Sequence, residues 1–557
     1  MADKTAQEYI SIYEHEYNRA ENTNFRSLWQ ETSDLIYPME NQITTLRTAG
    51  ERKTDEIYDV TAKMESQNMA SDLSNIIIPA GERFFEIELF DESLNNIENI
   101  KRYLSLITQK THNEIFRSNF MLQFNECTRS LIVFGTGNMY SEFGMLNKKG
   151  TNSGVDTALN FCDYPIGSYI IFENSKGLVD TMFVKFSYTA IQAVSEFGED
   201  KVGERILKAF NNPKKQNDFF EFLHIVKPRY NRNVNGRDKS NMPFESIYIA
   251  IADKHLIDEG GFQEFPFHVP RWMKSSSEIW GRGQGTEILP VVKMLQRMHE
   301  AVVDSGNLAN NPPREILDTF EGRLRTHPGA SNYVQQIPST REMYNAGGNF
   351  PITKEILEFE QQIVKDSFYS NILNQMIDLK GDRRTTLEIA ERVKAGLKRL
   401  ALPVARLYGE LFNTLIPRCV NILIRNGFLP LPPQELRGKN FNIKYVGALA
   451  LALRSQQSQA YKEWLSFVAQ TSQFDIGALD IVNMDKGNKN LARAYGVNED
   501  VIATEEEIIA KREVRNQQQQ AMQQNEILKT ATKGYKDAKD APEDGSPAAM
   551  MMETING

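Results

Sequence analysis

Two helical segments on either side of an irregular insert are the feature that most limits how this chain can fold. In the first segment, apolar residues are spaced by three and four positions, which is the spacing of one helix face. They are Ile288, Val291, Leu295, Met298 and Val302. A second such face runs through residues 356–376, with Thr353 as the expected N-cap. Residues 309–352 are rich in Pro, Gly and Asn and show no long period, so the chain should form a helical hairpin with a small domain at its tip.

A third, very long helix is predicted after the hairpin. Thr385 and Glu388 have the spacing of a capping box, in which each side chain bonds the other residue's backbone N–H. The apolar face then continues toward a C-cap at Asn426-Gly427. Such a helix would be about 60 Å long at about 1.5 Å per residue. Bends are expected at Pro403 and Pro417.

The N-terminal half mixes helices and strands. Helical spacing covers three ranges, 7–36, 61–78 and 98–134. Phe84–Phe90 alternates as a strand, and residues 137–267 are predominantly β, with one short helix at about 189–197 and a turn at Asp258–Gly261. The fold class predicted for the whole chain is α+β, mainly helical, with an antiparallel sheet in this half.

The C-terminal part is again helical. Residues 505–529 form a Gln-rich segment in which Arg512, Arg515 and Glu526 keep the helix charged. A solvated helix or a coiled-coil element is therefore favoured over a prion-like tract. The residues from Tyr535 onward lack a period and core-forming side chains, so disorder is expected there.

Composition excludes several classes of protein. With 41% hydrophobic and 25% charged residues, the chain is neither disordered throughout nor collagen-like. Lys and Arg total 64 against 73 Asp and Glu, and the net charge of −9 argues against a protein that coats DNA with its whole surface. A local basic site is still compatible with this charge.

Cysteines and apolar runs indicate the compartment. Cys127, Cys162 and Cys419 are far apart and form no C-x-x-C pair, so buried reduced thiols are expected rather than disulfides or a thiolate zinc site. The N-terminal segment lacks the apolar core of a secretory signal, which predicts a cytoplasmic product. No run reaches the ~18 apolar residues of a spanning helix, so no membrane role is predicted.

Catalytic motifs are missing from the sequence. There is no G-x-x-x-x-G-K-[ST] phosphate cradle, no H-E-x-x-H and no G-x-S-x-G. The glycine clusters Gly135–Gly137 and Gly281–Gly285 lack dinucleotide-binding spacing and are interpreted as turns or close packing. We therefore predict no catalytic residues, no metal site and no cofactor, although paired carboxylates facing a shared cleft cannot be recognised from sequence.

Seven strings, in this order, resemble the portal or head-to-tail connector proteins of tailed bacteriophages, especially the podovirus type. The strings are Trp29–Pro38, Tyr58–Thr61, Pro79–Phe85, Val133–Tyr140, Trp280–Gly283, Asn311–Pro313 and Arg384–Arg392. The resemblance covers about residues 10–530 and implies a structural protein, not an enzyme. It also implies a ring, usually of twelve subunits, at one capsid vertex, through which DNA is pumped in by a separate terminase ATPase and later ejected.

The parts of the family would map onto this chain in sequence order. They are a wing (1–284), a first stem helix (285–308), a clip (309–352), a second stem helix (353–377), a tunnel loop (378–384), a long wing helix (385–430), a helical crown (431–534) and a disordered tail (535–557). The implied partners are further copies of the chain, the backbone of double-stranded DNA, terminase, major capsid and scaffold proteins, and tail adaptors. No membrane partner is implied, and a chain made in the host cytoplasm would end in the virion.

Two groups of basic residues are the candidate sites. Three in the predicted tunnel loop would contact DNA phosphates without reading sequence: Lys380, Arg383 and Arg384. The alternative is that the two arginines pair with Asp378, Asp382 or Glu388. Three in the predicted clip would line the exit or contact terminase and tail adaptors: Arg323, Arg325 and His327. The alternative for these is an ordinary solvated surface.

The charge balance suggests how such a channel would handle DNA. A strongly basic lumen would hold the duplex through counterion release, whereas an acidic wall with a few basic rings would guide it without gripping. Without the resemblance, the two helical faces are best explained as the core of one monomer's hairpin. The rival functions are another neck or tail adaptor protein and, less favoured, a DNA-processing enzyme such as a nuclease.

Overall fold

In the computed structural model, the chain divides into two compact units, Met1–Leu453 and Arg454–Gly557, and each is described by itself. The described residues are 2–40, 42–48, 50–54, 57–79, 83–95, 97–144, 157–233, 236, 238–310, 314–316, 340–342, 350–371, 399–436, 441–446, 464–471, 481–485, 487–489, 503 and 505–537.

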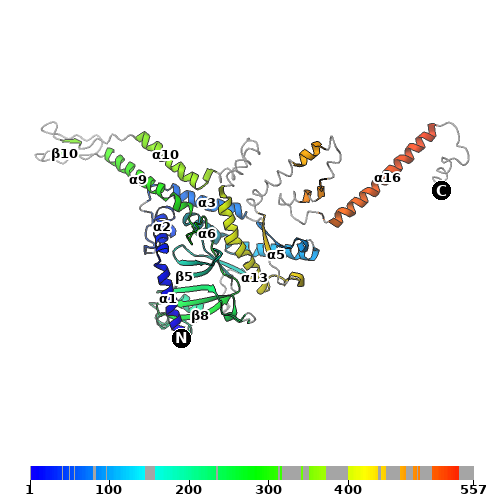
Figure 1. The fold of residues 1–557 in the computed structure, drawn as a ribbon. Coiled ribbons are helices and arrows are strands. Elements are labelled where there is room, and N and C mark those ends of the chain that lie inside the picture. Colours follow the sequence, from blue (N-terminus) through cyan, green and yellow to red (C-terminus); the bar gives the residue numbers. More distant parts are fainter. Residues whose placement is uncertain are drawn as a thin grey trace. The chain divides into compact units, whose positions relative to one another are not determined.

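A five-stranded antiparallel sheet in the first unit confirms the predicted β region (Figure 1). Its strands are β4 (Tyr169–Glu173), β5 (Val179–Thr189), β6 (Phe219–Pro228), β7 (Phe244–Ala250) and β8 (His255–Phe262), each paired with the next. Helix α1 (Ala2–Tyr17) covers one face, where Ile10 packs with Leu223 and Ile225. Helices α7 (Ala190–Phe197) and α8 (Glu204–Phe210) cover the other face. Side chains that alternate along the strands therefore pack into two different cores, one on each face of the sheet.

The turn predicted at Asp258–Gly261 is wrong, because these residues lie inside β8. The chain reverses instead at 251–254, where Lys254 has a φ of +50°. Strand β8 is at the edge of the sheet and pairs only with β7, with Gly260 opposite Ser246. Glycines are tolerated at a sheet edge, so their presence did not mark a turn.

Four helices form the other layer of the first unit. They are α2 (Ala20–Ile36), α3 (Thr61–Ile77), α5 (Glu98–Arg117) and α6 (Phe120–Phe134), with short η1 (Pro38–Glu40) and α4 (Glu92–Asn95). The helix predicted over 61–78 is confirmed. The single helix predicted over 7–36 is wrong, because α1 and α2 are separate. Side chains of Asn22 and Arg26 donate to carbonyls at the end of α1, which satisfies that helix end.

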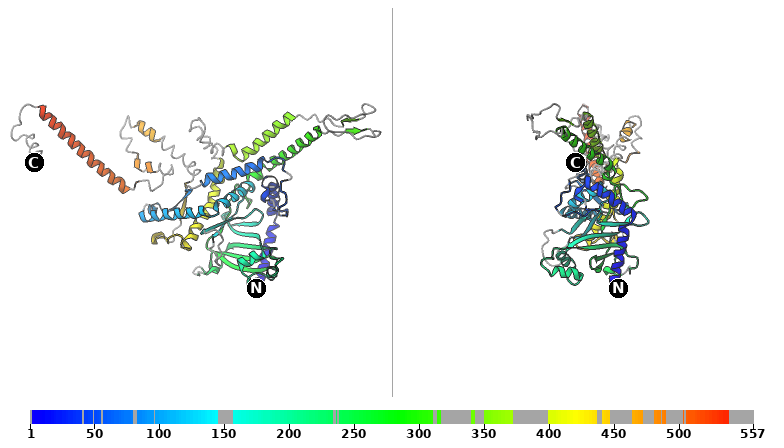
Figure 2. Two further views of the ribbon diagram at one scale, coloured as in Figure 1. Left: turned by 180° about the vertical axis from the view of Figure 1, so that it is seen from behind. Right: turned by 90° about the vertical axis from the view of Figure 1, so that its left-hand side faces the viewer.

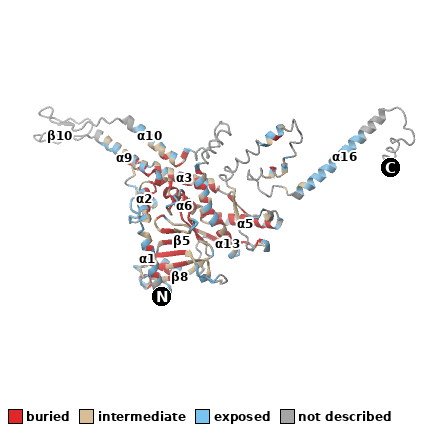
Figure 3. Ribbon diagram, viewed as in Figure 1, coloured by how far each residue is buried: buried red, intermediate tan, exposed pale blue. Residues whose placement is uncertain are grey.

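Similarly, the range 98–134 contains two helices, since Ser118 and Asn119 turn the chain between α5 and α6. The Ser118 hydroxyl donates to the Ile115 carbonyl and accepts from the Phe120 N–H. Most of α6 is buried, as Figure 3 shows. It packs against α3, so it is the central helix of the main core.

Two smaller sheets join distant segments. The predicted strand at 84–90 is β1 (Phe85–Leu89), and it pairs antiparallel with β12 (Phe441–Tyr445). A three-stranded sheet has β2 (Met139–Phe143) between β3 (Leu159–Asp163) and β9 (Phe267–His268). The short helix η4 (Gln434–Leu436) precedes β12, and the short helix η2 (Lys239–Asn241) lies between β6 and β7 of the five-stranded sheet.

The predicted helical hairpin is present, with α9 (Gln284–Asn310) packed against α10 (Phe350–Ser367). The two helices run alongside each other in the left view of Figure 2. Strands β10 (Arg314–Ile316) and β11 (Thr340–Glu342) pair antiparallel within the insert between the helices. The predicted N-cap Thr353 is wrong because α10 already begins at Phe350. Helix α10 ends at Ser367, short of residue 377, and Tyr369 just beyond this end has a φ of +57°.

The long helix after the hairpin is described from residue 399. A helical stretch 399–406 leads into a π-helical segment, η3 (Leu407–Phe412), and then α13 (Asn413–Arg425). The π segment lies between the two prolines at which bends were expected. Pro417 lies inside α13 and has no backbone N–H to donate. The Thr414 hydroxyl donates to the carbonyls of Glu410 and Leu411, and the Tyr445 phenol donates to the carbonyl of Tyr408. The predicted C-cap is confirmed, since Gly427 has a φ of +78°. The predicted capping box lies outside the described residues.

In the second unit, residues 464–471 are helical and α16 spans Glu505–Asp537. The predicted helix is confirmed, and most of its described side chains are exposed (Figure 3). Because α16 extends to Asp537, the first residues of the predicted disordered tail are helical; the rest of the tail lies outside the described residues. No helix in the described ranges is long and apolar enough to cross a membrane. All three cysteines are free, as predicted, with Cys162 only half-buried.

The two glycine clusters pack against each other, as the turn or close-packing interpretation predicts. Gly135 caps α6 with a φ of +94°. A Cβ atom added to Gly283 would lie 2.5 Å from the Gly135 nitrogen and 2.5 Å from the Ile132 carbonyl oxygen. The start of α9 is therefore pressed directly against the end of α6, backbone to backbone.

We predict that Gly283→Ala lowers the free energy of unfolding by about 1–3 kcal/mol, because backbone atoms must move to admit the methyl group. Gly306→Ala, also in α9 but with open space at its Cβ position, is the matched control. The control should be neutral or stabilising by about 0.5–1 kcal/mol. Urea unfolding of both variants checks this; equal stability would contradict the close packing.

Candidate functional site

The residues predicted as sites from sequence all lie outside the described residues. Lys380, Arg383 and Arg384 belong to 372–398, and Arg323, Arg325 and His327 belong to 317–339. Their contacts with DNA or partners stay predictions. The candidate site is therefore built from the parts of the helical hairpin that the structure describes.

The outer face of α9 carries a shallow apolar groove with two cations. The groove has a volume of about 430 Å³ and is lined by Pro290, Lys293, Met294, Arg297, Met298 and Ala301. Met294 is 40% exposed although it is apolar. The buried apolar residues of the same helix are Ile288, Leu289, Val292 and Leu295. Ile288 and Leu295 belong to the predicted stripe, so the face toward the core overlaps that stripe and lies partly to one side of it.

Helix α10 also leaves an apolar face uncovered. Phe359 is 64% exposed and Ile356 is 44% exposed, whereas Val364 and Phe368 on the inner side are buried. The residues around this outer face are charged, and exposed Lys354, Glu355 and Glu358 include the ion pair Lys354–Glu358. Large exposed apolar side chains on neighbouring turns mark an interaction surface more often than a solvated one.

The two outer faces point away from the inside of the hairpin. Gln296 of α9 and Gln361 of α10 both face Asp59, which fixes the inner side of each helix. At about 100° per residue, Met294 and Phe359 each lie about 160° from that inner residue. Charged groups at both faces have partners within the chain, since Lys293 pairs with Glu31 and Glu358 pairs with Lys354 of the same helix. What the two faces share is exposed apolar surface, with Met294 on α9 and Phe359 on α10.

The base of the hairpin is held by Asp59, which is 6% exposed. Its Oδ1 atom accepts from the backbone N–H of Thr61 at 2.9 Å, at the start of α3. Its Oδ2 atom accepts from Gln361 Nε2 at 2.7 Å and lies 3.1 Å from His299 Nε2. One buried carboxylate thus contacts α3, α9 and α10.

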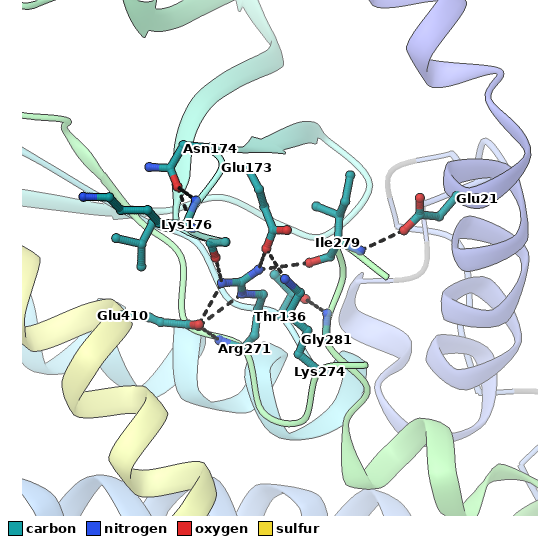
Figure 4. A network of polar contacts seen from close by, with 12 residues as sticks. Glu21, Thr136, Glu173, Asn174, Lys176, Arg271, Lys274, Ile279, Gly281 and Glu410 are labelled. Carbon is teal, nitrogen blue, oxygen red and sulfur yellow. Dashed lines mark hydrogen bonds and ion pairs between the residues drawn. The ribbon is translucent and has the colours of Figure 1, made fainter. Parts of the chain in front are cut away.

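Arg271 is the centre of a second buried polar network (Figure 4). Its guanidinium contacts Glu410 at 2.7 Å and also pairs with Glu173. The Arg271 backbone N–H donates to the other Glu410 oxygen at 2.8 Å. Burial alone would lower the pKa of Arg271, but the hydrogen bonds with Glu410 and Glu173 raise it above its ordinary value. This network joins the loop before α9 to the π-helical segment.

One buried Ser–His pair resembles catalytic machinery but is enclosed. His268 Nε2 lies 2.8 Å from Ser141 Oγ, and His268 Nδ1 lies 2.7 Å from Thr414 Oγ1. Ser141 and His268 are at most 1% exposed, and burial holds the pKa of His268 well below its ordinary value. Because no substrate can reach this pair and no carboxylate orients the imidazole, the pair is polar packing. Among the described residues, no group of His, Cys, Asp or Glu could hold a metal ion.

Sequence reasoning missed both buried networks. Arg271 and Glu410 are far apart in the chain, so no local spacing signals their pairing. Asp59 lies in one of the recognised strings, Tyr58–Thr61, and an Asp two residues before a helix start is a weak capping signal. That signal could have identified its contact with Thr61, but not the contacts with the hairpin.

Comparisons with known proteins agree with the resemblance. The sequence matches the model of one family, described as "Bacteriophage head to tail connecting protein", over residues 8–502. The portal protein of Salmonella phage epsilon15 is 27% identical over 540 residues, which cover 95% of each chain. The "Probable portal protein" of Bordetella phage BPP-1 is 23% identical over 522 residues, covering 92% of this chain and 91% of that protein.

We predict that Glu410→Gln lowers the free energy of unfolding by about 3 kcal/mol, because it leaves the buried Arg271 short of one counter-charge. The matched control is Glu204→Gln, which breaks the exposed Glu204–Lys208 pair. The control should change stability by less than about 0.5 kcal/mol. Chemical denaturation measures both, and similar small losses would show that the network adds little stability.

Proposed function

The chain belongs to the bacteriophage head to tail connecting proteins, and we propose that it works as the portal subunit of a tailed phage. In this proposal, copies of the chain form a closed ring at one capsid vertex, and double-stranded DNA passes through the ring's central channel. The role is structural, as it is for the family. The names of the two relatives, one called a portal protein and the other a probable portal protein, support it.

The observation that carries the proposal is the pair of uncovered apolar faces on the hairpin. A closed ring requires heterologous contacts, in which one face of each subunit meets a different face of the next. The α9 groove, where Met294 is exposed, and the α10 face, where Ile356 and Phe359 are exposed, are two such different faces, and each would bury apolar surface against the other. The occupant of each face in our proposal is a second copy of this chain.

The parts of the chain then take the roles expected from the resemblance. Helices α9 and α10 act as the two stem helices, the insert between them as the clip, and residues 1–284 as the wing. Residues 378–384 act as the tunnel loop, and the helix that includes η3 and α13 as the long wing helix. The second unit contains most of the proposed crown. Terminase, capsid, scaffold and tail proteins are the proposed partners, and the twelvefold subunit number is an expectation from the family.

Contact with DNA would be independent of sequence. Lys380, Arg383 and Arg384 are the proposed phosphate contacts, in a channel whose subunits each carry a net charge of −9. An acidic wall keeps counterion release from trapping the duplex during its passage. The rival functions, a smaller adaptor or a DNA-processing enzyme, are less well supported, because both relatives match along nearly their whole length and carry portal names.

We predict that the wild-type chain forms rings with a central hole in negative-stain images. Met294→Asp, in the α9 groove, and Phe359→Asp, on the α10 face, should each abolish rings, because each places a charge in an apolar contact. Both residues are exposed, so the thermal unfolding of the monomers should be unchanged. Leu122→Asp, at another exposed apolar position, is the control and should still form rings.

Mixing the two variants gives a sharper result. A Met294→Asp chain keeps its α10 face and a Phe359→Asp chain keeps its α9 groove, so a mixture should form dimers through one intact contact, but no rings. Mass photometry distinguishes these species. Rings from either variant alone would refute the hairpin interface, and a wild-type chain that never forms an annulus would refute the proposed function.

We also predict that replacing Lys380, Arg383 and Arg384 together by Ala leaves ring assembly intact but reduces the packaging or retention of DNA. The reason is that the change removes phosphate contacts without altering the hairpin faces. The measurement is ring yield together with DNA packaged per particle. Loss of rings in this variant would mean that the loop is structural instead.

A further inference from the structure

We propose that Asp59 is a positioning residue that sets the angle between the helical hairpin and the body, and thereby the number of subunits that close the ring. This inference rests on the proposed function, since it concerns the ring. It adds to that function a specific determinant within the chain, located at the base of the hairpin and away from the two outer faces.

The contacts of Asp59 connect three helices through one carboxylate. Helix α3 is reached through the Thr61 N–H, α10 through the Gln361 amide at 2.7 Å, and α9 through His299. A carboxylate that accepts hydrogen bonds on both oxygens has little freedom to rotate. The hairpin therefore cannot swing against α3 without losing at least one of these contacts.

Gln296 of α9 fixes the same segment from the other side. Its Oε1 atom accepts from the backbone N–H groups of Tyr58 at 2.7 Å and Asp59 at 2.8 Å, and its Nε2 atom donates to the Asp59 carbonyl at 2.8 Å. Gln296 is 7% exposed, so water does not compete freely for these bonds. Both glutamine amides thus hold Asp59 in place between the two hairpin helices.

A second contact point turns this attachment into a defined direction. The Ser370 hydroxyl, just after α10, donates to Glu65 of α3 at 2.6 Å. Gln361 lies about 9 Å from Ser367, the last residue of α10, at about 1.5 Å per helical residue, and Ser370 follows beyond that end. Two separated contacts between α10 and α3 fix an angle, whereas a single contact would allow rotation.

The subunit number of a ring is sensitive to this angle. In a ring of about twelve subunits, adding one subunit changes the rotation between neighbours by only about 2°. Over the length of α9, about 40 Å, a 2° tilt moves the tip by about 1.4 Å. The loss of one hydrogen bond in the base contact is enough to permit such a movement, so the hairpin angle needs a rigid base.

The test uses the full-length chain and counts subunits by native mass spectrometry. Gln361→Glu places a second carboxylate against Asp59 and should replace the single wild-type ring size by a shifted or mixed distribution differing by at least one subunit. The double variant Asp59→Asn with Gln361→Glu restores a hydrogen bond with its direction reversed, and should return the wild-type ring size. Gln362→Glu is the matched control, since its exposed side chain bonds Asp366 and not Asp59.

Thermal unfolding of each variant is measured in parallel. If Gln361→Glu does not fold, Gln361→Leu removes the same hydrogen bond without adding a charge, and the same change in ring size is expected. A shifted subunit number, or open arcs in place of rings, supports the role of Asp59. An unchanged ring size in folded Gln361 variants, beside normal wild-type rings, overturns it while leaving the proposed function intact. Wild-type chains that form no rings would refute both proposals.

Discussion

The direct contact of two backbones, at the end of α6 and the start of α9, is the constraint on which the rest of the structure depends. Three glycines of 281–285 have no room for a Cβ atom, because carbonyl and amide groups of residues 132–136 occupy that space. The first turn of α9 is therefore fixed on the most buried helix of the body. The outer faces of the hairpin depend on this backbone contact, because they are uncovered only while the hairpin is held in its observed direction.

Local patterns in the sequence predicted the elements whose causes are local. The helix at 61–77, the strand at 85–89, the hairpin helices and the C-cap at Gly427 all have their signals within a few residues. The errors arise where contacts that leave no mark in the spacing of apolar residues decide the outcome. The glycines of 258–261 lie in a strand because β7 pairs with them on one side, and α1 separates from α2 because Asn22 and Arg26 satisfy the carbonyls at the break.

The division between local signals and contacts made only in the folded chain also explains how much of the functional site could be predicted. The order of the motifs was sufficient to indicate the family, which the comparison over residues 8–502 shows. Asp59, Gln296 and Gln361 come from three separate parts of the chain and meet only in the folded structure. A single sequence contains no spacing that links them. The basic residues proposed for the channel and the clip were chosen by their place in the segments that the family resemblance implies, and they stay predictions.

The pairing of β1 with β12 has a consequence for how the chain folds during its synthesis. Phe85–Leu89 is synthesised early, but its partner, Phe441–Tyr445, emerges only after some 350 further residues. Until then one edge of β1 has open N–H and C=O groups beside apolar side chains, which is the kind of surface that captures foreign strands. Pairing across so long a separation is also slow. Nascent chains therefore pass through a stage in which nearly all of the body exists yet its final strand is missing, and misassembly is most probable during that interval.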